Sequence, residues 1–221
     1  KKQQQRKKKI KKKTKKKILK LHRIGIQMLA LIGLGNPSSS HKNNRHNIGF
    51  MLIDSIVRYK NLGVYKNKFN AHIMNTQISS IPVILAKPQT FMNKSGMCVS
   101  QIMHFYKLET KNIVIFHDDI DLQLGKIKTK IGGSNGGHNG LKDIDEHIGN
   151  EYRRVRIGIG HPGEKSLVSD YVLGDFNKKD LITTTSFIKT ITNQIDSLIM
   201  SLHKNLSSEI SSLIKISSKT E

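Results

Sequence analysis

From Met28 onward, the sequence alternates short apolar runs with stretches of helical periodicity. Residues 28–34 (MLALIGL) and 112–116 (NIVIF) are continuous apolar runs, which are typical of buried strands. Residues 48–59 and 95–106 instead repeat their apolar side chains with the spacing of an amphipathic helix. Strands that alternate with helices along a chain favour the α/β class, so we predict an α/β fold.

The other segments fit the same interpretation. Further strands are expected at 64–78, 82–86, 125–130 and 152–159, and further helices at 141–148 and 181–202. The sequence has no internal repeat and no long linker after residue 27, which favours a single domain over residues 28–205. We expect residues 206–221 to form a frayed C-terminal tail.

Positive charge is concentrated at the start of the chain. The formal net charge is +22, but residues 1–27 hold 14 of the 38 Lys and Arg and none of the 16 acids. We expect this segment to be a disordered, Lys-rich extension, which either binds RNA as a polycation or has no function of its own. Residues 28–221 still carry +8, which favours a polyanionic partner.

The single cysteine, Cys98, excludes an internal disulfide and fits a reducing compartment. No segment approaches the ~20 uninterrupted apolar residues of a membrane span. The basic start is not followed by the clean apolar stretch and small-residue cleavage site of a signal peptide. We therefore expect a cytoplasmic protein with no membrane partner.

Polar residues stand where the expected strands end or helices begin. Asn36 follows the first strand, His46 precedes the helix at 48–59, and Asn93 precedes the helix at 95–106. Ligands of open α/β sheets bind beyond the carboxyl ends of the strands, so these are candidate site residues. Each also has a structural interpretation: Asn36 as a turn residue before proline, His46 as a surface or capping residue, and Asn93 as an N-cap.

The segment His117–Asp121 (HDDID) ends the strand NIVIF and admits two interpretations. Three carboxylates beside a histidine invite a metal site. No second cluster of His, Asp or Glu with ligand-like spacing stands nearby, so we expect no metal ion. Asp118 is then better used to orient and polarise a histidine.

A glycine-rich stretch, residues 132–140 (GGSNGGHNG), runs directly into an expected helix. Glycines let the backbone approach a ligand closely, and a helix N-terminus favours an anion or oxyanion. A flexible linker is also rich in glycine, but it would hardly carry His138 and Asn139 into a helix.

Together these residues suggest that water attacks an acyl group. Cys98 lies on the apolar face of its helix, and no GxSxG nucleophile elbow is present. A base (His46), a carboxylate (Asp118) and amide side chains that hold the water and the oxyanion would suffice for this chemistry.

Six ordered segments resemble the bacterial-type peptidyl-tRNA hydrolase family, over roughly residues 28–205. They are Gly33–Pro37, Arg45–Gly49, Phe91–Gly96, His117–Leu122, Gly132–Asp143 and Arg156–Gly163. The resemblance implies a mixed, twisted central sheet flanked by helices. It also implies a monomer, without metal or organic cofactor, that binds peptidyl-tRNA rather than DNA. The implied reaction is hydrolysis of the ester that joins the peptide to the tRNA.

The resemblance also implies roles for individual residues. The catalytic set falls on His46, as base, and on Asp118 and Asn36. Substrate-binding positions fall on Asn93, Asn139, Met92, His138 and His41. Cations that grip the tRNA acceptor end fall on Lys128, Lys130 and Arg156, and the alternation of residues 125–130 independently puts Lys126, Lys128 and Lys130 on one face.

The chain departs from the family pattern at Ser38, at His41, where an aromatic residue is common, and at Ser134-Asn135. These departures concern the rate and the grip on the substrate. Two other functions are open: an inactive relative that binds RNA without hydrolysis, and a metal-dependent phosphoesterase built on His117–Asp121.

Overall fold

The computed structural model describes residues 28–204, so the expectations for residues 1–27 and 206–221 lie outside the described residues. The strands are β1 (Leu29–Gly33), β2 (Lys66–Lys68), β3 (Ala71–Ile78), β4 (Ile81–Pro88), β5 (Ile113–Asp119), β6 (Ile127–Ile131) and β7 (Arg153–Gly158). The α-helices are α2 (Ile48–Tyr59), α3 (Ser95–Tyr106), α4 (Asn139–Ile148), α5 (Val168–Leu173), α6 (Lys178–Asn193) and α7 (Ile195–His203). Short 3-10 turns are η1 (Ser39–His41), η2 (Arg45–Asn47), η3 (Met92–Lys94), η4 (Thr110–Asn112) and η5 (Lys165–Leu167).

All seven strands belong to one sheet, in the order β2-β3-β4-β1-β5-β7-β6. The four central strands, β4, β1, β5 and β7, are parallel, whereas β2 and β3 at one edge and β6 at the other are antiparallel. The sheet is therefore mixed, and the predicted α/β fold of a single domain is confirmed. The carboxyl ends of the parallel strands all meet at the same edge.

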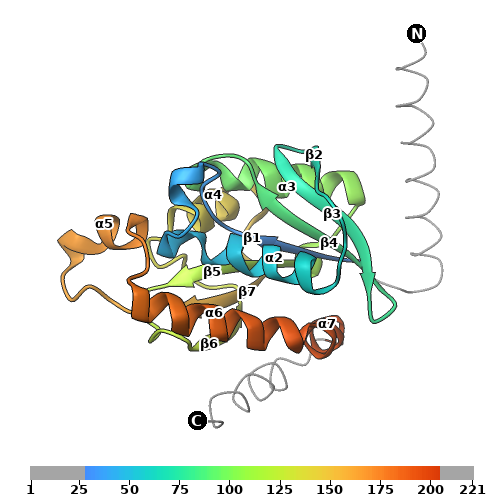
Figure 1. Cartoon of the computed structure of the whole chain (residues 1–221). Helices are drawn as coiled ribbons and strands as arrows, with labels where there is room; N and C mark the ends of the chain where they lie inside the picture. The colour runs from blue at the N-terminus through green and yellow to red at the C-terminus, as the bar shows by residue number, and fades with distance from the viewer. Residues whose placement is uncertain (1–27, 205–221) are drawn as a thin grey trace.

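Helices cover both faces of the sheet and make three layers (Figure 1). Alternate residues of the central strands point to opposite faces, as the pleat requires. Leu31 and Phe116 pack with α2, α6 and α7, whereas Ile32 and Ile115 pack with α3 and α4. Full burial of each such side chain contributes roughly 1.5–3 kcal/mol relative to exposure.

Two glycines bring β1 and α2 into backbone contact. A Cβ on Gly33 would lie 2.2 Å from the carbonyl oxygen of Gly49, and a Cβ on Gly49 would lie 2.5 Å from the amide nitrogen of Leu34. The amide of Phe50 also donates to the carbonyl of Leu34 at 3.1 Å. This close approach holds the start of α2 beside the carboxyl end of β1.

Several boundaries differ from the sequence expectations. The long helix expected at 181–202 is two helices, α6 and α7, which meet at Gln194. The Thr192 hydroxyl donates back to the carbonyl of Ile188, a contact that bends helices. The strand expected at 64–78 is the hairpin of β2 and β3, because Phe69 and Asn70 have positive φ.

The strand expected at 125–130 is β6, which begins only at Ile127 and continues to Ile131. The helix expected at 141–148 begins two residues earlier, at Asn139. Helix α5 was not expected from the sequence. None of the helices within residues 28–204 is long and apolar enough to cross a membrane.

Candidate active site

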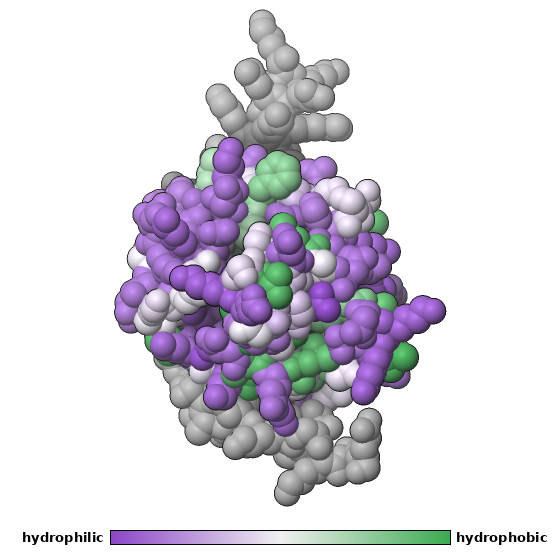
Figure 2. All heavy atoms as spheres, turned by 90° about the vertical axis from the view of Figure 1, so that its left-hand side faces the viewer, coloured by the Kyte–Doolittle hydropathy of each residue, from purple (hydrophilic) through white to green (hydrophobic). Residues whose placement is uncertain are grey.

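A cleft of about 540 Å³ opens at the carboxyl edge of the sheet, beside α5. Figure 2 shows the molecule from this side, where hydrophilic side chains cover most of the surface and hydrophobic areas lie between them. The cleft receives side chains from β5, β6, β7, η3, α4 and α5. Of the site residues predicted from the sequence, it is lined by Asn36, His46, Met92, Asn93, Asp118, Lys130, His138, Asn139 and Arg156.

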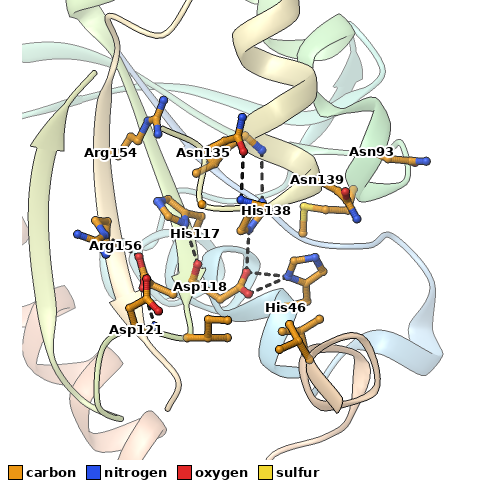
Figure 3. A pocket seen from close by; sticks show the side chains of 18 of the residues that line it. His46, Asn93, His117, Asp118, Asp121, Asn135, His138, Asn139, Arg154 and Arg156 are labelled. Atoms are coloured by element: carbon orange, nitrogen blue, oxygen red, sulfur yellow. Dashed lines mark hydrogen bonds and ion pairs between the residues drawn. The ribbon is translucent and has the colours of Figure 1, made fainter. Parts of the chain in front are cut away.

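Asp118 lies at the centre of the cleft and is buried, with 3% of its surface exposed. The Nδ1 atom of His46 lies 2.8 Å from both carboxylate oxygens of Asp118, and the Nε2 atom of His138 lies 3.1 Å from Oδ1. Figure 3 shows the two histidines converging on this carboxylate from different segments. One carboxylate therefore orients two imidazole rings.

The hydrogen bonds of His138 define its protonation. Its Nδ1 atom accepts from the backbone amides of Gly140 and Leu141, at 3.1 and 3.3 Å, and so caps α4. An atom that accepts from two N–H groups carries no proton, so Nε2 carries the proton and donates it to Asp118. His138 is thus held as a neutral donor. The sequence suggested that the amides at the start of α4 bind an oxyanion. Two of them, those of Gly140 and Leu141, instead donate to His138.

The charges around Asp118 shift the pKa of each partner. Burial works to lower the pKa of His46, but the charge and the hydrogen bond of Asp118 outweigh it and raise this pKa above 6.5. Burial would raise the pKa of Asp118, but His46 and His138 hold it well below its usual value. The burial of His117 lowers its pKa to about 3. Asp118 is therefore ionised.

Asn36 is fixed by its neighbours. Its backbone amide donates to Oδ1 of Asn47 at 2.8 Å, and its carbonyl accepts from Nδ2 of Asn47 at 3.0 Å. Its side-chain oxygen accepts from the amide of Met92 at 2.9 Å, which turns its NH₂ group into the donor on the cleft wall. Asn47 is a positioning residue that the sequence analysis did not single out.

The glycine-rich loop is held by a buried network. Arg154, 2% exposed, donates to the carbonyl of Ser134 at 2.6 Å and to Asp145 at 3.1 Å. Asp145 also accepts from the hydroxyl of Tyr152 at 2.7 Å and from Asn135 at 3.4 Å. Arg154 was not among the predicted site residues, although its place two residues before Arg156 on one strand puts both on the same face.

The cations assigned to tRNA lie on β6 and β7, at one end of the cleft. Lys128 pairs with Arg156 across β6 and β7, so the two side chains share a face. Lys128 and Lys130 are exposed, and only Lys130 and Arg156 line the cleft itself. The Nε atom of Arg156 is bound at 2.5 Å to Asp119, which leaves its outer nitrogens for a ligand.

Helix α5 forms a wall of the cleft, through Val168, Ser169, Val172 and Leu173. Arg45, next to His46, fastens this wall by donating to the carbonyls of Tyr171, Gly174 and Asp175 at 2.9–3.3 Å. Its guanidinium also lies 4.1 Å from the ring centre of Tyr171.

His41 does not line the cleft. Its Nδ1 atom accepts from Nδ2 of Asn44 at 3.0 Å. The structure therefore does not bring this predicted substrate-binding residue together with the others.

Within residues 28–204, one group of side chains has the spacing of metal ligands: His46, Asp118 and His138, with ligand atoms within 4.8 Å of one another. A metal ion could bind Nε2 of His138 only if that nitrogen lost its proton. Because Nδ1 accepts from two backbone amides, the proton of the ring stays on Nε2. The segment His117–Asp121 fits no better, because Asp119 is paired with Arg156 and the Nδ1 atom of His117 donates to a backbone carbonyl.

Comparisons with known proteins agree with this architecture. The family model described as "Peptidyl-tRNA hydrolase" matches residues 30–219. A peptidyl-tRNA hydrolase of Sinorhizobium fredii is 49% identical over 183 residues, which cover 83% of this chain and 77% of the relative. One of Beijerinckia indica is 48% identical over 164 residues, covering 74% and 81%. The crystal structure of peptidyl-tRNA hydrolase from Acinetobacter baumannii superposes with a TM-score of 0.75 at 35% identity, covering 85% of this chain and 94% of that one.

The α/β fold and these relatives together place the protein in the class of hydrolases. The chain belongs to the peptidyl-tRNA hydrolase family, and the resemblance drawn from its six ordered segments is confirmed.

Proposed function

We propose that this protein hydrolyses the ester between the peptide and the terminal ribose of peptidyl-tRNA, with His46 as the base. The observation that carries the proposal is the contact of Nδ1 of His46 with the buried, ionised Asp118. Donation from Nδ1 to the carboxylate leaves Nε2 unprotonated and available to a water molecule in the cleft. The neighbouring His138 cannot replace His46, because both of its nitrogens are engaged.

The reaction proceeds by attack of water. His46 removes a proton from water while the oxygen attacks the ester carbonyl carbon, and Asp118 stabilises the imidazolium. The amide groups of Asn36 and Asn139 donate to the water and to the developing oxyanion; one such donor is typically worth about 2.7–4 kcal/mol. The bond to the ribose oxygen then breaks, and His46 returns its proton to that oxygen. The products are free tRNA and a peptide carboxylic acid, which loses its proton to solvent and becomes a carboxylate.

The two ends of the substrate are held apart. The acceptor end of the tRNA docks on Lys128, Lys130 and Arg156, which supply charge without reading sequence. The peptide lies near Met92 and Asn93, which line the cleft. Hydrogen bonds from Asn93 to the peptide backbone would let the enzyme spare ordinary aminoacyl-tRNA. Cys98 takes no part, because burial raises the pKa of its thiol to about 12.

A peptidyl-tRNA release assay tests this proposal. The purified protein should release peptide and tRNA equally with and without a chelator, whereas a metal-dependent phosphoesterase would stop with the chelator. The variant His46→Ala should lose ~10²–10⁴ in turnover and keep nearly all of its tRNA affinity. The matched control is His104→Ala, an exposed histidine on α3 that should behave like wild type. Binding without hydrolysis in the wild type, or equal loss of binding and turnover in His46→Ala, would contradict it.

A further inference from the structure

A second cavity, of about 570 Å³, lies on the other side of Asn36 from His46. Asn36 lines both this cavity and the catalytic cleft, but neither His46 nor Asp118 reaches the second one. No step of the hydrolysis described above uses it.

The sheet order gives the two cavities a defined relation. The catalytic cleft takes side chains from β5, β6 and β7, whereas the second cavity takes His72 from β3, Lys87 from β4, and residues of α2 and α6. Strand β1, which leads to Asn36, lies between β4 and β5. A ligand that crosses the carboxyl edge therefore meets the cations of β6, then His46, then Asn36, and finally the second cavity.

The second cavity is cationic. Its lining contains Lys42, Arg58, Lys87 and Lys189 and a single carboxylate, Asp54, for a formal charge of +3. Asp54 is engaged inside the wall: it pairs with Lys87 at 2.6 Å and accepts from the hydroxyl of a neighbouring tyrosine at 2.7 Å. Burial and Lys87 together lower the pKa of the nearby histidine, His72, so it adds no charge at pH 7.

Three cations are then left for a ligand, because Lys42, Arg58 and Lys189 are all exposed at this cavity. The same lining also offers four apolar side chains, Phe50, Met51, Leu181 and Ile188, among Ser, Thr and Asn residues. A peptide with acidic and apolar side chains can use both the exposed cations and these apolar contacts. In addition, we expect the tRNA to bind at the opposite end of the carboxyl edge of the sheet, on β6.

We propose that the second cavity binds the part of the substrate's peptide that lies several residues upstream of the ester, and that it favours acidic residues there. The inference rests on the proposed function, since it assigns a binding site to the upstream residues of the same peptidyl-tRNA. It makes Lys42, Arg58 and Lys189 specificity-determining residues that never touch the reacting atoms.

The test compares three substrates that share one tRNA and the same two residues next to the ester. One carries only that acetylated dipeptide, and two carry longer peptides with either aspartates or lysines upstream. The enzymes are wild type, the triple variant Lys42→Gln/Arg58→Gln/Lys189→Gln, and the matched control Lys66→Gln on exposed strand β2. Melting temperatures check that each variant is folded.

In the wild type and the control, kcat/KM should be about three- to tenfold higher for the acidic than for the basic long peptide, the size expected of a few exposed charge contacts. The triple variant should bring this ratio close to one and leave the short substrate unaffected. A second variant, Arg58→Glu, should shift the preference towards the basic peptide.

Two results would overturn the inference. An unchanged ratio in the triple variant would show that these cations do not meet the peptide. An equal fall on the short substrate would show that they bind the tRNA instead. Failure of the proposed function looks different, because the wild type would then hydrolyse none of the three substrates.

Discussion

In the proposed function, the centre of the cleft and the cationic end on β6 meet the substrate under opposite physical conditions. Asp118 is buried, and its charge is fixed by two hydrogen-bonded imidazoles. Lys128 and Lys130 are exposed, on flexible side chains that solvent ions reach. Charges at buried sites interact strongly and escape salt, whereas exposed charges are screened. Changes at the centre should therefore alter kcat, and changes at the cationic end should alter KM and its salt dependence.

The largest effect is expected from Asp118→Asn. An amide has no charge to stabilise protonated His46, and its NH₂ group faces one of the two N–H donors. We expect kcat to fall by about 10²–10⁴-fold with little change in tRNA affinity, measured by single-turnover release and by binding. The matched control is Asp121→Asn, an exposed carboxylate in the same cleft, which should leave kcat unchanged. A similar loss in the control would instead favour a carboxylate cluster as the reactive unit.

The next largest effect is expected from Arg154, which holds the loop beside Asp118 in place. Arg154→Lys keeps the charge but cannot reach both Ser134 and Asp145 in the same planar arrangement. We expect the loop that carries His138 to move and kcat to fall by as much as ~10²-fold, because small misplacements of reacting groups are costly.

Tyr152→Phe is the control for Arg154→Lys. It removes the hydroxyl bond to Asp145 but leaves the contact of Arg154 with Ser134. It should cost about 1 kcal/mol of unfolding free energy and no activity. If thermal melting and kcat fall in the same proportion in both variants, Arg154 acts through stability alone.

The pH profile separates the centre from the surface in another way. His46 accepts a proton only when it is neutral, and Asp118 raises its pKa above 6.5. As pH falls through that raised value, kcat/KM should drop about tenfold per pH unit. In Asp118→Asn the raising causes are gone and burial remains, so the acid limb of the residual activity should move below 6.5. A limb that stays in place would assign it to another group.

The strands at the centre of the sheet were predictable, because β1 and the first four residues of β5 are continuous apolar runs. The motifs that identified the family owe part of their pattern to packing: Gly33 and Gly49 leave no room for a Cβ between strand and helix. Local patterns of this kind are visible in one sequence. The same patterns place His46 and Asp118 at the carboxyl edge of the sheet.

Contacts between distant segments were not predictable. The fastening of α5 by Arg45 joins residues far apart in the chain, and no periodicity announces it. The cap of α4 by His138 and the burial of Arg154 depend on which loop folds over which strand. The break at Gln194 between α6 and α7 similarly follows from tertiary packing, since both halves keep helical spacing in the sequence. Sequence patterns therefore indicated the candidate site, but not the residues that hold it in place.

The smallest effect is expected at the cationic end. Lys128→Gln/Lys130→Gln removes two exposed charges that no buried partner needs, so kcat and stability should stay the same. Each exposed contact with a phosphate is worth ~0.2–1 kcal/mol, so KM should rise by about three- to tenfold. The slope of log KM against log salt should become shallower by roughly 0.7–0.9 for each lysine, since each phosphate contact releases counterions. Lys66→Gln, on β2 at the opposite edge of the sheet, should change neither quantity. If the double variant keeps the wild-type salt slope, the tRNA binds elsewhere; if it loses kcat instead, the cationic end belongs to the catalytic centre and the contrast between the two regions fails.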